Sequence, residues 1–84
     1  MMDHRHLNGK RILVVDDEPD ILDTIEDLLP MCTVIKASSF EEASTALQSR
    51  PLDLAVLDIM GVDGYKLLAL AKKRGVPSVM LTAK

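Results

Sequence analysis

The sequence of 84 residues contains a single cysteine, Cys32, so it cannot form a disulfide within one chain. Cys32 also has no second thiol with which to share a metal ion, and a reducing compartment, the cytoplasm, is therefore expected. The polar start, Met1 to His6, lacks the apolar centre of a secretory signal. No apolar stretch approaches the length of a membrane-spanning helix, so no membrane partner is expected.

Clustered positive charge is also scarce. The net charge is -3, and the basic residues are scattered apart from one run, Lys72-Lys73-Arg74. Nucleic-acid phosphates are bound by clustered Lys and Arg, so no direct nucleic-acid partner is expected. The run lies at the end of a predicted helix, where cations suit the helix dipole, and we interpret it as structural.

Two short apolar runs, Ile12–Val15 and Leu54–Leu57, each lead directly into aspartate. Such runs are typical of strands buried on both faces of a parallel sheet. Further strands are predicted at 32–37 and 78–81, the former at a sheet edge because it is less apolar. Helices are predicted at 19–29, 40–50 and 64–74, from apolar spacing, from a Ser39-to-Glu42 capping box and from Gly75 as the residue after the last helix.

The alternation of strands and helices predicts an α/β fold with a parallel sheet and right-handed crossovers. Residues 1–10 are predicted to be a flexible lead-in, and residues 11–84 to form one domain. The apolar stripe of the first helix is expected to comprise Ile21, Leu22, Ile25, Leu28 and Leu29.

Oxygen-bearing side chains follow three of the predicted strands: Asp16-Asp17, Asp58 and Thr82. If these strands are neighbours, the side chains converge at the carboxyl edge of the sheet, where open α/β sheets build their ligand sites. Converging carboxylates repel one another, and Mg²⁺, which prefers oxygen ligands, removes the conflict. An aspartate beside Mg²⁺ is a candidate nucleophile toward phosphorus. The alternative is structural, because aspartate is also common in turns and helix caps.

Three motifs in order carry a resemblance to a known family: 14–19 (Val-Val-Asp-Asp-Glu-Pro), 57–64 with its Leu-Asp start and Asp-Gly end, and Leu81-Thr82-Ala83. Together they resemble the receiver domain of two-component response regulators. The resemblance implies a flavodoxin-like, doubly wound parallel sheet with strand order 2-1-3-4. It also implies a phosphoacceptor switch, whose donor is a phosphohistidine on a sensor histidine kinase.

The resemblance assigns roles residue by residue. Asp58 matches the phosphoacceptor, Asp17 the direct Mg²⁺ ligand, and Asp16 the acid that holds the ion or acts through water. Met60 matches the position whose backbone carbonyl completes the metal shell. Asp58 itself belongs to the same ligand set.

Two positions beyond the fourth strand also match the family. Thr82 corresponds to the switch hydroxyl that contacts the phosphoryl group, and Lys84 to a position that modulates hydrolysis. The family usually has proline four residues after the acceptor, where Val62 stands here, so the loop is expected to follow a different path. The family's later helix, strand and helix, with an invariant lysine, have no counterpart in the sequence.

The resemblance leaves three functional readings open. The first is a receiver that is not an enzyme and shows at most slow self-dephosphorylation. The second is a truncated receiver that acts only as an interaction or assembly module. The third, an aspartyl-phosphate hydrolase, needs an acid two residues after the nucleophile, and Met60 holds that position. The uncovered edge of strand 78–81 is further expected to form a homodimer or higher assembly.

Overall fold

A computed structural model describes residues 8–58 and 63–81 of the chain. Strands and helices alternate, as the sequence predicts. In chain order the elements are β1 (Arg11–Val15), α1 (Pro19–Leu28), β2 (Thr33–Ala37), α2 (Phe40–Ser49), β3 (Leu54–Asp58), α3 (Gly64–Lys73) and β4 (Ser78–Leu81).

The four strands form one parallel sheet in the order β2-β1-β3-β4, which confirms the predicted topology. β1 and β3 are the central strands, and β2 lies at one edge, as its lower apolar content predicts. The register pairs Val15 with Leu57 and Asp58 with Leu81, so the central strands end at nearly the same level.

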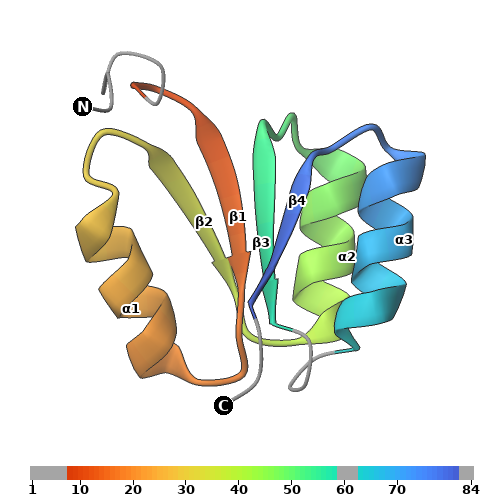
Figure 1. The fold of residues 1–84 in the computed structure, drawn as a ribbon, viewed down its shortest axis with the longest axis horizontal. Coiled ribbons are helices and arrows are strands. Elements are labelled where there is room, and N and C mark those ends of the chain that lie inside the picture. The colour runs from red at the N-terminus through yellow and green to blue at the C-terminus, as the bar shows by residue number, and fades with distance from the viewer. Residues whose placement is uncertain (1–7, 59–62, 82–84) are drawn as a thin grey trace.

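The helices cover the two faces of the sheet unequally. α1 lies on one face, and α2 and α3 lie side by side on the other (Figure 1). The larger core cluster lies beneath α2 and α3 and includes Leu13, Leu47, Leu57 and Leu67, all essentially inaccessible to solvent. Among the described residues, the buried members of the cluster beneath α1 are Ile12, Val14 and Leu22.

The apolar stripe predicted for α1 is wrong at one position. Leu28 is 70% exposed, whereas Leu22 is buried and Ile25 and Leu29 are partly buried against the sheet. Leu28 occupies the last helical turn, and α1 is the one helix on this face among residues 8–58 and 63–81, so no neighbouring helix covers a second row of its side chains there.

The start of α2 differs in detail from the predicted capping box. The Ser39 hydroxyl accepts a hydrogen bond from the Glu42 backbone N–H at 3.2 Å, as expected of an N-cap. The Glu42 carboxylate, however, accepts from the backbone N–H and the hydroxyl of Ser38, at 2.8 and 3.1 Å, rather than from the Ser39 backbone. The carboxylate therefore ties the helix to the preceding turn.

The end of α3 agrees with the prediction for Gly75. This glycine has φ +75° and donates its N–H to the Lys72 carbonyl, while the Val76 N–H reaches the Ala71 carbonyl at 2.8 Å. The two bonds form a Schellman motif, in which the left-handed residue turns the chain away from the helix. Val76 and Ala71 then pack in the same core cluster and set the start of β4.

No helix in the described part of the chain is both long and apolar enough to cross a membrane.

Candidate functional site

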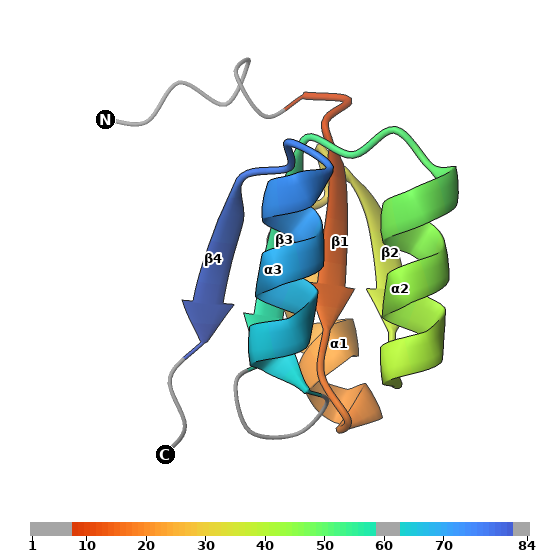
Figure 2. The same cartoon turned by 90° about the vertical axis from the view of Figure 1, so that its right-hand side faces the viewer.

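The carboxyl edge of the sheet brings together the acids that the sequence places after β1 and β3. β1 and β3 are adjacent and parallel, so the residues that follow Val15 and Leu57 emerge side by side. The chain leaves β1 toward α1 on one face, while α2 and α3 connect the strands across the other face (Figure 2). This is a topological switch point, the place where open α/β sheets form ligand sites.

Asp16 is the buried acid of this edge, with 8% of its surface exposed. Its backbone N–H donates to the Ala37 carbonyl at 3.1 Å, and its Oδ1 accepts from the Glu18 backbone N–H at 2.8 Å. Burial raises the pKa of the Asp16 carboxyl, and the nearby charges of Asp58 and Asp17 raise it further, although the Glu18 N–H opposes the shift. Asp16 therefore lies in a field of negative charge.

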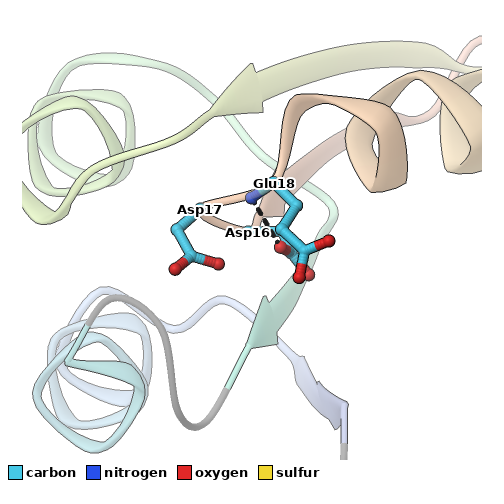
Figure 3. Close-up of side chains that lie close together, drawn as sticks. All are labelled: Asp16, Asp17 and Glu18. Carbon is cyan, nitrogen blue, oxygen red and sulfur yellow. Dashed lines mark hydrogen bonds between the residues drawn. The ribbon is translucent and has the colours of Figure 1, made fainter.

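Asp16, Asp17 and Glu18 form a tight carboxylate cluster. One oxygen from each residue lies within 4.8 Å of the others, and all three side chains project from the loop between β1 and α1 (Figure 3). Asp17 and Glu18 are exposed. Three hard oxygen donors around a partly open position fit Mg²⁺, which uses few carboxylates and keeps several waters.

Glu18 is the member that the sequence reasoning missed as a potential ligand. From the sequence alone, an acid before Pro19 at a helix start is explained by the helix dipole. Glu18 is the N-cap residue of α1, but its side chain does not cap the helix; one of its carboxylate oxygens instead lies with those of Asp16 and Asp17. An acid directly after the aspartate pair is the sequence signal that could have identified it.

Asp58 is the last residue of β3 and is half-buried between β1 and β4. It is not a member of the 4.8 Å cluster, but its charge acts on Asp16, which places the two carboxyls at a common site. Of the other predicted site residues, Met60, Thr82 and Lys84 lie outside the described residues.

The arrangement combines a strand-end carboxylate with an adjacent oxygen-rich cluster. A cation held there would reduce the repulsion among the acids and attract an anionic group to the Asp58 oxygens. The site can therefore bind a divalent cation and bring a phosphoryl group next to a carboxylate nucleophile.

Comparison with known proteins identifies close sequence relatives. The family described as response regulator receiver domain matches residues 12–84. The probable transcriptional regulator ycf27 of Cyanophora paradoxa is 43% identical over 82 residues, covering 92% of this chain and 34% of that protein. Response regulator GtcR of Aneurinibacillus migulanus is 35% identical over 81 residues, covering 90% and 34%. The chain thus spans about a third of the length of these curated relatives.

Solved structures of receiver domains also resemble this chain. A CheY-like response regulator receiver domain protein from Methanospirillum hungatei superposes with a TM-score of 0.82 at 32% identity, covering 92% of this chain and 66% of that one. The N-terminal domain of a response regulator receiver protein from Methanoculleus marisnigri gives a TM-score of 0.78 at 43% identity, with coverages of 88% and 67%.

Proposed function

The chain belongs to the response regulator receiver domain family, and we propose that it accepts a phosphoryl group on Asp58 in a two-component phosphorelay. The donor is a phosphohistidine on a sensor histidine kinase, and the relay operates in the cytoplasm. One observation carries this proposal: Asp58 ends a central strand beside the cluster of Asp16, Asp17 and Glu18. The family assignment supports two-component signalling in general, and the geometry supports Asp58 as the acceptor.

The transfer is an in-line displacement at phosphorus. A carboxylate oxygen of Asp58 forms a bond to phosphorus as the bond to the histidine nitrogen breaks, and the imidazole leaves with the electron pair and takes up a proton. Bound Mg²⁺, for which Asp16, Asp17, Asp58 and the Met60 carbonyl are the proposed ligands, would neutralise charge on the transferring group. Glu18, the third member of the carboxylate cluster, is proposed to join this ligand set directly or through water.

The protein then acts as a switch rather than as an enzyme. The Thr82 hydroxyl is proposed to donate a hydrogen bond to the new phosphoryl oxygens, and Lys84 to modulate access of the hydrolytic water. Turnover as a hydrolase is less well supported, because Met60 stands where a proton donor would be needed. Slow self-dephosphorylation resets the switch.

Phosphorylation by a small phosphodonor such as acetyl phosphate tests this function. Wild-type protein with Mg²⁺ is expected to gain one phosphoryl group by intact mass, and Asp58→Asn is expected to gain none. Asp53→Asn is the matched control, because Asp53 lies just before β3, at the opposite end from Asp58, and its side chain contacts the Arg11 backbone N–H. Labelling of Asp58→Asn at the wild-type level would refute the acceptor assignment, and donor turnover without a stable adduct would favour the hydrolase.

Association through β4 is the second proposed function, favoured by the shape of the sheet. Among the described residues β4 pairs only with β3 and lies at the edge of the sheet (Figure 2). Val79 on this strand is 49% exposed. An apolar strand with one unpaired edge is a template for another strand, and we propose a homodimer or higher assembly through it.

Size-exclusion chromatography with light scattering tests this assembly. The wild-type protein is expected to dimerise with increasing concentration, and Val79→Lys to remain monomeric, because charged side chains block edge pairing. Thr33→Lys places the same charge on the opposite edge strand β2 and is expected to leave the dimer intact. A monomeric wild type at high concentration would overturn the proposal, as would equal loss of association in both variants.

A further inference from the structure

A cleft of about 270 Å³ opens at the amino edge of the sheet, the end opposite the carboxylate cluster. It is lined by the start of β1, by the ends of α2 and α3 and by the segment that leads into β3. Three arginines from three separate elements meet there: Arg11 begins β1, Arg50 is the C-cap of α2, and Arg74 is the C-cap of α3. Only folding brings these residues together, because they are far apart in the sequence.

The arginines retain donors that the protein does not use. One guanidinium nitrogen of Arg74 donates to the Gln48 carbonyl at 3.2 Å. No ion pair joins Arg11 or Arg50 to any residue in the parts of the chain that the structure describes. The acid that lines the cleft, Asp53, uses one oxygen to accept the Arg11 backbone N–H at 2.8 Å. Each guanidinium carries five N–H donors, so most of the donors of these three arginines make no bond within the described residues.

Helix dipoles do not cancel the positive charge of this cleft. The C-terminal ends of α2 and α3 each contribute the equivalent of about half a negative charge. Together with Asp53 they offset two of the three arginine charges, which leaves about one net positive charge on the lining. Lys72 and Lys73 in the last turn of α3 add to the field from nearby. The cleft is thus a positive site on a chain whose net charge is -3.

We propose that this cleft binds a compact oxyanion of the phosphate class. Guanidinium groups present paired donors that match phosphate oxygens. Arginines from three separate elements that line one cleft can contact different oxygens of one tetrahedral anion. The volume lies just below the range of about 300–1,000 Å³ that is usual for larger ligands, so a single phosphate or phosphate monoester fits better than a nucleotide. This binding is independent of phosphoryl transfer at Asp58, which lies at the other end of β3.

Titration of the full chain with inorganic phosphate tests this proposal. Backbone amide chemical shifts are followed at constant ionic strength, without Mg²⁺ and with a chelator, in the Asp58→Asn background so that the acidic site takes no part. Saturable shifts are expected at Arg11, Asp53 and Gly75. Arg50→Gln is expected to weaken binding about tenfold, as loss of one charge-assisted contact would.

Lys73→Gln is the matched control, because it also removes one positive charge near the end of a helix, here α3, but Lys73 does not line the cleft. It is expected to bind phosphate within about twofold of the parent protein, since it loses only a screened, longer-range attraction. Among the described residues the Arg50 side chain makes no hydrogen bond or ion pair, so Arg50→Gln is expected to fold, and the amide spectrum of the free variant verifies this. Equal weakening by both substitutions, shifts that do not saturate, or shifts confined to residues 16–18 would overturn the proposal.

Discussion

Replacement of Asp16 by asparagine is expected to stabilise the metal-free protein and to weaken its response to Mg²⁺. The substitution keeps the oxygen that accepts the Glu18 backbone N–H, so the turn before α1 is preserved. It removes the one buried charge of the cluster. Because burial and the neighbouring carboxylates raise the pKa of Asp16, its charged form is held at a cost in folding free energy.

The size of the effect follows from the geometry. Two unit charges 4.8 Å apart repel by about 0.9 kcal/mol in water, and 0.1 M salt reduces this by roughly a third to a half. Asp17 and Asp58 both act on Asp16. Asp17 contributes about 0.5 kcal/mol at this distance and the Asp58 charge adds to it, so the expected rise in Tm is at least about 2 °C for a domain of this length.

Mg²⁺ should reverse the order of stability. At a concentration ten times its Kd, an ion that binds only the folded state adds about 1.4 kcal/mol to the free energy of unfolding. The wild type is expected to gain this amount and Asp16→Asn much less, because it has lost a ligand charge. Urea unfolding followed by circular dichroism, with and without Mg²⁺ and at one ionic strength, measures both differences. Asp53→Asn controls for removal of a negative charge elsewhere and should respond to Mg²⁺ like the wild type.

Two results would contradict this reasoning. If Asp16→Asn is less stable than the wild type without metal, the Asp16 charge is stabilised by contacts stronger than the repulsion described above. If Mg²⁺ stabilises Asp16→Asn and the wild type equally, the cation binds elsewhere and the cluster is not its site.

Three further predictions concern the fold. Leu57→Ala removes a side chain with no exposed surface and should cost about 2–5 kcal/mol in urea unfolding, whereas Leu28→Ala at an exposed position should stay within about 0.5 kcal/mol; similar losses would contradict the core assignment. Hydrogen bonds from Ser38 lower the pKa of Glu42, so the charged Glu42 carboxylate stabilises the fold above about pH 4.5, and this stabilisation is lost as pH falls through the lowered pKa. Glu42→Gln should therefore flatten that part of the pH–stability curve, and an unchanged slope would refute this explanation. Gly75→Ala meets no atom within 4 Å, so its expected cost of about 1–2 kcal/mol is purely the left-handed backbone, and a neutral effect in thermal unfolding would exclude that explanation.

The sequence predicts the elements well because their signals are local. Apolar runs that end in aspartate indicate β1 and β3, and Gly75 indicates the end of α3, since each depends only on neighbouring residues. The strand order follows from the family resemblance and is confirmed by the sheet. Which side of α1 becomes covered is not local, so the prediction for Leu28 is wrong: helical spacing includes it in the stripe, but in the described part of the chain no second helix packs beside α1.

The candidate site is predictable in part for the same reason. Asp16, Asp17 and Asp58 follow strands, so parallel topology alone brings them to one edge. The place of Glu18 in the cluster depends on how the chain turns into α1, which the sequence does not specify. The arginine cleft forms where the ends of two helices meet the start of a strand. In the sequence its arginines are isolated or helix-terminal charges, and only the fold places them in one cleft.

Both charged ends of the sheet follow from one property of parallel α/β folds. Each helix begins at the carboxyl edge of the strands and ends at the amino edge, so acids that suit helix starts and bases that suit helix ends separate to opposite edges. Segregation of charge along the strands is therefore expected of the fold and does not by itself identify a site. Close approach of like charges is what identifies a site. The helix dipole does not explain why three carboxylate oxygens lie within 4.8 Å of one another, or why three arginines line one cleft. The matched pairs of variants distinguish charge segregation by the fold from a specific site. Asp16→Asn and Asp53→Asn remove the same charge, but only Asp16 belongs to the carboxylate cluster. Arg50→Gln and Lys73→Gln also remove the same charge, but only Arg50 lines the cleft.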